Sequence, residues 1–296
     1  MHAPLEIAKQ LQNQVLMALQ QHQLINARAA CSQLLSQFPN SPHAIEMVAV
    51  IASYENDPEK AVSLFDVLAT HYPNEPNVHW NLARVLLASG QFERGWQENE
   101  WRHGLLVAPR FPTPHWKGEP IANRRILLHA EGGFGDTFNF CRYVPLVAKL
   151  GAEVMVECQP QVRSLLARLP GVTATFVPGE DLPPFDVHCP FLSLPLAMGT
   201  TLSTIPANVP YLIATPEKTA KWAHLLGQRK MPRVGISWAG SPQPIDVRSH
   251  ALSIFAPLAG IRNVEFHSLQ KGPQASEFRP PGLQVIDHSH QLEDFE

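Results

Sequence analysis

Residues 131–136 combine three glycines with a terminal carboxylate, in the sequence EGGFGD. The glycines, Gly132, Gly133 and Gly135, allow the backbone to approach a ligand closely, and the start of a following helix offers N–H groups to an anion. Asp136 can act as a general base that takes the proton of an acceptor hydroxyl, or it can cap that helix. The residues alone leave both roles of Asp136 open.

Two common nucleotide-binding motifs do not fit this loop. No Gly-Lys-Ser/Thr follows it, so it is not a P-loop. Counted from Gly133, the third glycine position of the dinucleotide fingerprint holds Phe138. Glu157, at the end of the next predicted strand, keeps a ribose-binding interpretation open.

Two cations follow predicted strands in the C-terminal part of the chain. They are Arg248, in IDVRSH, and Lys271, in SLQKG. Loops at the carboxyl ends of parallel strands share one edge of the sheet, so both side chains are expected there. Together they could bind a departing diphosphate, and each alone could be a solvated surface charge.

Histidine and cysteine patterns give no metal or nucleophile site. His288 and His290 are spaced to share one face of a strand, but no cysteine or carboxylate trio accompanies them, which favours a surface pair and no metal. Cys189 lies beside His188, and adjacent strand residues point to opposite faces, so a buried structural thiol is expected. The four cysteines include no CxxC pair, which argues against a zinc knuckle or a disulfide scaffold.

Composition places the chain among globular proteins. Its 296 residues suit two or three domains, and 45% hydrophobic with 17% charged residues excludes intrinsic disorder. A formal charge of -3 gives no general attraction to nucleic acid or anionic membranes. No apolar run is long enough to span a membrane, and the N-terminus lacks a signal-peptide pattern. The default expectation is a soluble cytoplasmic protein.

The N-terminal third contains a repeat. The motif FPNSP at 38–42 recurs as YPNEP at 72–76, and the small residues Ala27, Ala61 and Gly95 follow the same 34-residue period. That period, with a small residue inside each repeat and a proline at its end, is typical of the tetratricopeptide repeat. Three helix pairs are expected, at 5–39, 42–73 and 76–105. Such an array is expected to bind a protein or peptide partner.

A proline-rich connector follows the repeats. Residues 107–123 carry four of the chain's 28 prolines and show no periodicity, which predicts an extended, ordered segment. Trp116 is expected to be held on a neighbouring surface. Trp96 and Trp101 are expected to pack against the domain that follows the solenoid.

From residue 124 onward, short apolar runs alternate with helical patterns, which predicts a parallel, right-handed α/β sheet. The predicted strands are 124–130, 152–158, 172–177, 185–189, 233–240, 264–272 and 283–287. The predicted helices are 136–150, 160–169, 216–228 and 253–260. Ligands of such sheets bind at the carboxyl ends of the strands, which singles out the loops at 131–136, 239–248 and 270–273.

Several of these segments resemble known glycosyltransferases. GGFGDTFNFCRYVP, starting at Gly132, resembles the beginning of the bacterial heptosyltransferase family (glycosyltransferase family 9), where a Gly-Asp after the first strand supplies the catalytic base. The long run from Asp186, with GISWAGSP and FHSLQKG, resembles fusions of tetratricopeptide repeats with a glycosyltransferase. Those fusions share the layout of O-linked N-acetylglucosamine transferases. The resemblance covers nearly the whole chain.

The resemblance implies the GT-B architecture, in which two Rossmann-like halves face a cleft. Its domains would be the solenoid 1–106, the connector 107–123, an acceptor-side domain 124–215 and an incomplete donor-side domain 216–296. It implies metal-independent transfer of a sugar from a nucleotide-sugar co-substrate to a hydroxyl, with no further cofactor. Asp136 would be the base, and Gly132, Gly133, Gly135, Arg248 and Lys271 would contact substrate.

The resemblance also implies a chain truncated at its C-terminus. Three strands are expected after residue 232, whereas a doubly wound half usually has five or six. A truncated transferase would bind nucleotide-sugars weakly or not at all, and would be inactive. The alternative is a non-catalytic scaffold that binds a partner protein through its repeats. The residues do not decide between these two functions.

Overall fold

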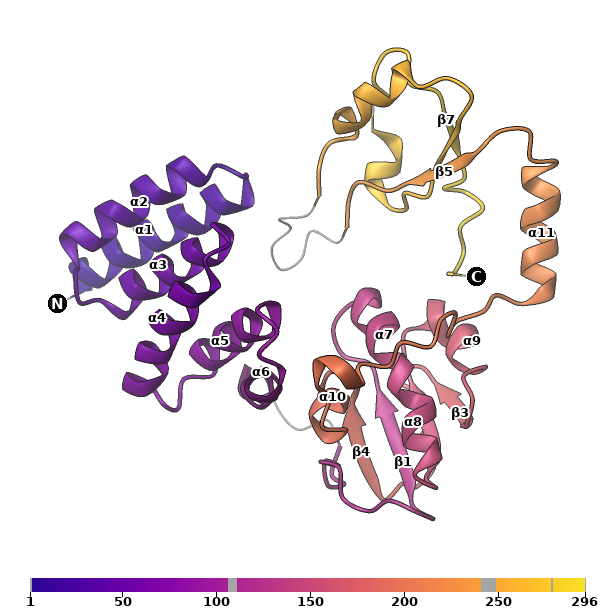
Figure 1. The fold of residues 1–296 in the computed structure, drawn as a ribbon, viewed down its shortest axis with the longest axis horizontal. Helices are drawn as coiled ribbons and strands as arrows, with labels where there is room; N and C mark the ends of the chain where they lie inside the picture. Colours follow the sequence, from indigo (N-terminus) through magenta and orange to yellow (C-terminus); the bar gives the residue numbers. More distant parts are fainter. Residues whose placement is uncertain (1, 106–110, 241–248, 278, 296) are drawn as a thin grey trace. The chain divides into compact units, whose positions relative to one another are not determined.

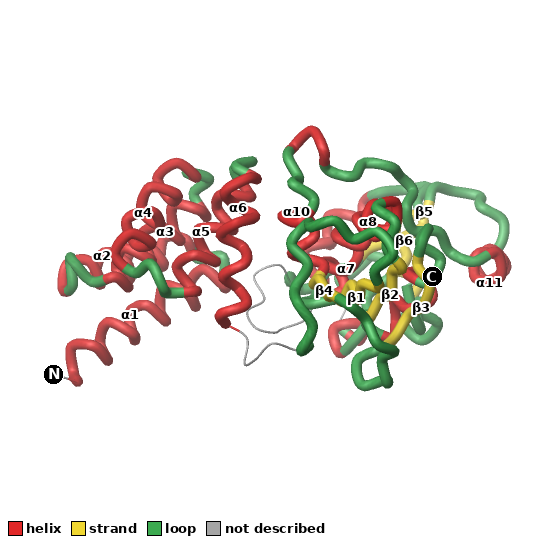
Figure 2. Tube along the Cα trace, turned by 90° about the horizontal axis from the view of Figure 1, so that it is seen from below, coloured by secondary structure: helices red, strands yellow, loops and turns green. Residues whose placement is uncertain are grey.

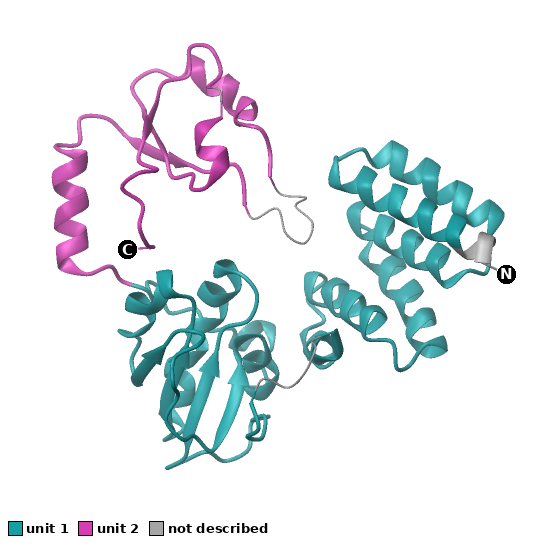
Figure 3. Cartoon of the chain, turned by 180° about the vertical axis from the view of Figure 1, so that it is seen from behind, with its two compact units in different colours: residues 1–212 teal, residues 213–296 magenta. Residues whose placement is uncertain are grey.

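The structure is a computed structural model that describes every residue except 1, 106–110, 241–248, 278 and 296. The chain forms two compact units, residues 1–212 and 213–296, which are coloured separately in Figure 3. The first unit holds both the solenoid and a parallel sheet, and the second holds a smaller parallel sheet. An α/β fold behind an N-terminal helical repeat is thereby confirmed.

Six α-helices and a short 3₁₀ helix build the solenoid (Figure 1). They are α1 (His2–Gln20), α2 (Leu24–Gln37), α3 (Pro42–Tyr54), α4 (Pro58–His71), α5 (Pro76–Ala88), α6 (Phe92–Asn99) and η1 (Glu100–Leu105). These pairs agree with the three predicted repeats. Prolines open α3, α4 and α5, where the missing N–H leaves no helical bond unmade.

The small residues of the 34-residue period lie where two helices meet. Ala27 and Ala61 are fully buried. A Cβ added to Gly95 would lie 2.7 Å from Cδ2 of Leu87, so no larger side chain fits between α5 and α6 without a shift. This close packing is the physical reason for the repeat that the sequence displays.

The first unit contains a four-stranded parallel sheet in the order β3-β2-β1-β4. Its strands are β1 (Arg125–His129), β2 (Glu153–Glu157), β3 (Val172–Phe176) and β4 (Val187–Pro190). The helices α7 (Phe134–Phe140), α8 (Val144–Lys149), α9 (Arg163–Leu166) and α10 (Leu194–Ala197) alternate with them. The core includes Ile126, Leu128, Val154 and Val156, all fully buried. Figure 2 shows the all-helical solenoid followed by alternating strand and helix.

The single helix predicted over 136–150 is wrong. It is divided into α7, a 3₁₀ turn at Cys141–Tyr143, and α8. Pro145 lies in the first turn of α8, and a proline inside a continuous helix would remove one hydrogen bond and clash with the preceding turn. The helix predicted over 160–169 is likewise shorter, with a 3₁₀ turn at Pro160–Val162 followed by α9.

Within the described residues 111–123, the connector contains no helix, and it covers the edge of β4. The Trp116 N–H donates to the His188 carbonyl over 2.8 Å, and the His188 N–H donates to the Pro114 carbonyl over 3.0 Å. Trp116 is 1% exposed within the core of the first sheet, and its indole N–H donates to the Glu119 carbonyl. The prediction that Trp116 is held on a neighbouring surface is confirmed.

Trp96 and Trp101 pack against different parts of the molecule. Trp96 contacts Phe140 of α7 edge to face, with ring centroids 6.3 Å apart, as predicted for packing against the next domain. Trp101 instead stacks on His79 of α5 at 4.2 Å. The prediction was wrong for Trp101 because its ring packs within the solenoid.

The second unit has three parallel strands in the order β5-β6-β7. They are β5 (Arg233–Ile236), β6 (Glu265–Ser268) and β7 (Val285–Asp287), preceded by α11 (Pro216–Leu226). The helix expected at 253–260 is a 3₁₀ helix over Leu252–Gly260, and it contains Pro257. A small core joins Trp238, Phe266 and Val285. In the described part of the chain, no helix has the length and apolar character needed to cross a bilayer.

Candidate functional site

The glycine-rich turn lies where expected, between the carboxyl end of β1 and the start of α7. Gly133 is the N-cap of α7, and Asp136 is the third residue of its first turn. Oδ2 of Asp136 accepts the Gly133 N–H over 3.0 Å. Asp136 is therefore not the capping residue itself. Its carboxylate instead reaches back to the cap, which fixes the side chain against the turn.

Gly132 and Gly135 differ in whether their position requires a glycine. Gly132 has φ +74°, and a Cβ there would lie 2.5 Å from Oδ2 of Asp136. That position accepts glycine alone without strain. Gly135 has no such restriction, because a Cβ there would meet nothing within 4 Å. The turn thus brings Gly132, Gly133, Gly135 and Asp136 together.

A glutamine from the neighbouring strand holds this turn. Nε2 of Gln159, two residues after β2, donates to the Gly132 carbonyl over 3.3 Å. Its Oε1 accepts the Thr137 hydroxyl over 2.9 Å. Sequence reasoning missed Gln159. Its position just after a strand that pairs with β1 was the available signal.

The last helical turn of the solenoid contacts the same loop. Nε of Arg102, on η1, donates to Oε1 of Glu131 over 3.1 Å, and the Arg102 residue is only 7% exposed. Nη2 of Arg102 also donates to the Ser193 hydroxyl over 2.8 Å. Glu131 starts the glycine-rich turn, so a buried ion pair joins the solenoid to the candidate site.

Glu100 belongs to this buried network. Burial raises the pKa of Glu100, but hydrogen bonds from His103, Arg102 and Ser193 and the Arg102 charge outweigh it and lower the pKa to about 2. Glu100 is therefore an anion at physiological pH. Sequence reasoning had not singled out Glu100, Arg102 or Glu131, because their contact joins segments far apart in the chain.

The predicted cations of the second unit are placed as follows. Nζ of Lys271 donates to the Ser289 carbonyl over 3.2 Å and also to the Leu292 carbonyl. Arg248 lies outside the described residues. Asp136 and Lys271 belong to different compact units.

Gln270, beside Lys271, organises the loop after β5. Its Oε1 accepts N–H bonds from Trp238 and Ala239 over 3.0 and 2.9 Å and the Ser237 hydroxyl over 3.2 Å. Its Nε2 donates to the carbonyls of Ala239 and Lys271. Gln270 is 3% exposed, which makes it a structural centre of the second unit rather than a ligand contact.

The prediction that His288 and His290 form a surface pair is wrong for His288. His288 is 6% exposed and stacks on His267 with ring centroids 5.1 Å apart. Their ring nitrogens Nε2 and Nδ1 lie 2.8 Å apart. His290 is exposed, so the two histidines do not form a pair. The reason is that β7 packs beside β6, which carries His267.

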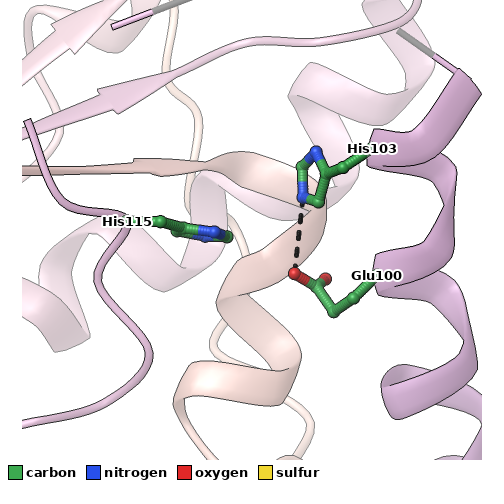
Figure 4. A group of neighbouring side chains, drawn as sticks. All are labelled: Glu100, His103 and His115. Carbon is green, nitrogen blue, oxygen red and sulfur yellow. Dashed lines mark ion pairs between the residues drawn. The ribbon is translucent and has the colours of Figure 1, made fainter. Parts of the chain in front are cut away.

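One group among the described residues could hold a metal ion: Glu100, His103 and His115 (Figure 4). Glu100 and His103 come from η1, and His115 comes from the connector. No metal site was predicted from the sequence, and His103 and His115, twelve residues apart, were not singled out.

The cysteines are structural. All four are free thiols and buried. Burial raises the pKa of both Cys141 and Cys158 to about 12, so neither is a thiolate at neutral pH. The expectation of a buried Cys189 is confirmed, because its side chain lies in the core of the first sheet.

The solenoid has a hollow between α3 and α5. Its volume is about 270 Å³. Its lining combines apolar and polar side chains, among them Tyr54, Asn81, Arg84 and Val85. The guanidinium of Arg84 lies over the ring of Trp80, 5.6 Å from its centroid. Arg84 is the charged side chain among these lining residues.

Comparison with known proteins finds only limited similarity. No model of a known protein family matches this chain. Protein FlbA of Caulobacter vibrioides is 34% identical over 76 residues, which are 24% of this chain and 13% of FlbA. The chain therefore spans only a small part of that relative.

Among solved structures, a mutant O-GlcNAc transferase from Thermobaculum terrenum aligns with 99% of this chain and 77% of its own. The TM-score is 0.32 and the identity is 14%. A TM-score that low carries no argument about the reaction. The α/β assignment rests on the parallel strand order of the two sheets.

Proposed function

We propose that this chain is a glycosyltransferase-like protein in which Asp136 acts as the base that activates an acceptor hydroxyl. The observation that carries the proposal is the position of Asp136. It lies beside a glycine turn at the carboxyl end of β1, the edge where parallel α/β sheets bind ligands. The resemblance of this segment to glycosyltransferases supports the same assignment.

The geometry suits proton abstraction. Oδ2 of Asp136 is occupied by the Gly133 N–H, whereas Oδ1 has no hydrogen-bond partner among the described residues. Oδ1 would accept the proton of the acceptor hydroxyl. The hydroxyl oxygen would form the new bond to the anomeric carbon, while the nucleoside diphosphate leaves with the electrons of the bond that breaks.

Positive charge would stabilise the departing diphosphate. We assign that role to Lys271 and Arg248. The ammonium of Lys271 would exchange its two carbonyl partners for phosphate oxygens. Gly132, Gly133 and Gly135 would contact the acceptor through their backbone. A nucleotide-sugar would be the co-substrate, and no metal would enter the transfer step.

The test uses the whole chain with a panel of UDP-, GDP- and ADP-sugars, with water or a simple glycoside as acceptor. Release of nucleoside diphosphate is followed by chromatography. Asp136→Asn should lower the rate by at least about 100-fold, because general-base catalysis contributes 10²–10⁴-fold. The matched control is Asp181→Asn at an exposed loop position, which should keep the rate. Equal rates for Asp136→Asn and the native chain would exclude Asp136 as the base.

The hollow between α3 and α5 favours a second function, in which the repeats bind an acidic peptide. An array of peptides of varied charge, probed with the native chain, should show binding to acidic members. Arg84→Glu should abolish that binding, whereas Lys149→Glu, an exposed charge reversal outside the hollow, should not. Binding that is indifferent to Arg84→Glu would exclude the hollow as the peptide site.

A further inference from the structure

Two segments converge at the end of the solenoid, where η1 meets the connector. Glu100 and His103 lie three residues apart on η1, so their side chains share one face. His115 approaches from the connector, and each of the three side chains offers one ligand atom within 4.8 Å of the others (Figure 4).

One edge of the group fits a tetrahedral ion. Zinc binds histidine nitrogen and carboxylate oxygen at roughly 2.0–2.2 Å, so two ligand atoms of a tetrahedral site lie about 3.3–3.5 Å apart. Nε2 of His103 and Oε2 of Glu100 lie 3.4 Å apart, which matches one such edge.

His115 presents a nitrogen that lacks a partner. Its Nε2 is shielded from solvent and makes no hydrogen bond within the described residues. In the neutral imidazole, a nitrogen without a hydrogen carries the lone pair that binds a metal.

The carboxylate of Glu100 is oriented by groups outside the triad. Its Oε1 accepts hydrogen bonds from Nη1 of Arg102 over 2.8 Å and from the Ser193 hydroxyl over 2.9 Å. Oε2 is the oxygen that faces His103. Hydrogen bonds of this kind to a metal-binding carboxylate fix its orientation and strengthen the site.

The charged side chains near the three ligands are mainly negative, which favours a cation. Two carboxylates, Glu100 and Glu131, share the single guanidinium of Arg102. All three side chains are mostly buried, at 24%, 19% and 8% exposure. The two carboxylates outnumber the one guanidinium, which favours the binding of a cation beside Glu100.

We propose that Glu100, His103 and His115 form a zinc site that joins the last turn of the solenoid to the connector. The ligands are one carboxylate and two imidazoles, and water takes the fourth position, as in zinc sites with three protein ligands. The site is separate from Asp136 and takes no part in sugar transfer. The competing arrangement is a direct contact between His103 and Glu100 with no metal bound.

The first experiment titrates zinc into the full chain, free of any polyhistidine tag and stripped with a chelator, by isothermal calorimetry. One zinc per chain is expected. His103→Gln and His115→Gln should each weaken binding by about 100-fold or more, and Ser193→Ala by about 10-fold, since outer hydrogen-bonding partners contribute 10–100-fold. The matched controls are His188→Gln, whose ring stacks on His115 at 5.5 Å, and the exposed His224→Gln. Both should bind zinc as the native chain does.

Two measurements on the native chain guard against variants that misfold. Zinc should raise its unfolding temperature, because the ion binds only the folded site. Cobalt should give the visible absorption of a four-coordinate ion. The proposal is overturned if the native chain binds no zinc, if folded His115→Gln binds as tightly as the native chain, or if cobalt is six-coordinate.

Discussion

The two α/β units hold a strand-end loop in the same way but with different numbers of hydrogen bonds. In each, a glutamine that follows one strand holds the loop after the neighbouring strand: Gln159 for the loop after β1 and Gln270 for the loop after β5. Gln159 makes two side-chain hydrogen bonds and is half-buried, whereas Gln270 is 3% exposed and makes four to the loop after β5 and a fifth to Lys271.

The difference indicates that the loop after β1 can accept a ligand, whereas the loop after β5 has a structural role. The loop after β1 keeps exposed glycines and a carboxylate with one unoccupied oxygen among the described contacts, so it can form new bonds with a ligand. Within the described residues 237–240 of the loop after β5, Gln270 bonds the Ser237 hydroxyl, the N–H groups of Trp238 and Ala239 and the Ala239 carbonyl. A ligand there would have to replace existing hydrogen bonds, which gains less free energy.

The largest effect is expected for Gln270→Ala. It would leave the buried Trp238 and Ala239 N–H groups without their acceptor, which costs about 3 kcal/mol or more. Urea unfolding followed by tryptophan fluorescence, to which Trp222 and Trp238 of the second unit contribute, measures the loss. The exposed Gln291→Ala is the control and should change the free energy of unfolding little. Equal effects of the two variants would contradict a structural role for Gln270.

The next largest effect is expected for Gly132→Ala. A residue with a Cβ at φ +74° is strained, and its Cβ would displace the Asp136 carboxylate, so about 1–2 kcal/mol should be lost. Gly135→Ala lies in the same turn with open space around it and should leave the free energy of unfolding unchanged or slightly higher. Urea titration of both variants measures the difference. A loss at both positions would mean that the turn resists any substitution.

A smaller effect is expected for Gln159→Ala. Its two hydrogen bonds are partly exposed to water, which replaces them, so about 1 kcal/mol should be lost. The control is Gln161→Ala, two residues along and exposed. If Gln159→Ala were as damaging as Gln270→Ala, the proposed contrast between the loops would be wrong.

The smallest effect is expected from pH in the second unit. Burial, aided by the charge of His267 and opposed by Asp287, lowers the pKa of His288 from 6.5. As the pH falls, His288 of the unfolded chain binds a proton before His288 of the folded chain does. The contribution of His288 to the free energy of unfolding is therefore complete above pH 6.5 and decreases below it. His288→Gln should flatten this dependence of the urea midpoint between pH 7.5 and 5.5, and the exposed His290→Gln should not. A flat native profile would contradict the assignment.

The sequence predicted elements better than contacts between them. Strong periodicity located the six solenoid helices, because the buried alanines of α2 and α4 recur with the repeat. The break at Pro145 was visible in the sequence but was not used. The seven strands were found with boundaries that were too wide, since an apolar run does not show where pairing ends.

The site was harder to predict. The glycine turn and Asp136 are contiguous, and the structure brings them together as predicted. Gln159 and Arg102 act on that turn across 27 and 29 residues of sequence, and glutamine or arginine alone carries no local pattern. His115 was hidden for the same reason, because its neighbours are distant in sequence and the fold alone sets their separation.

The ion pair between Arg102 and Glu131 has a thermodynamic consequence. Any partner whose binding turns η1 away from the sheet must separate these two buried charges, which costs free energy at the glycine turn as well as in the solenoid. Linkage then requires reciprocity: a ligand on the turn would change the partner's affinity by the same factor that the partner changes the ligand's. Occupancy of the helical array and binding of a ligand at the glycine turn would thus report on one another.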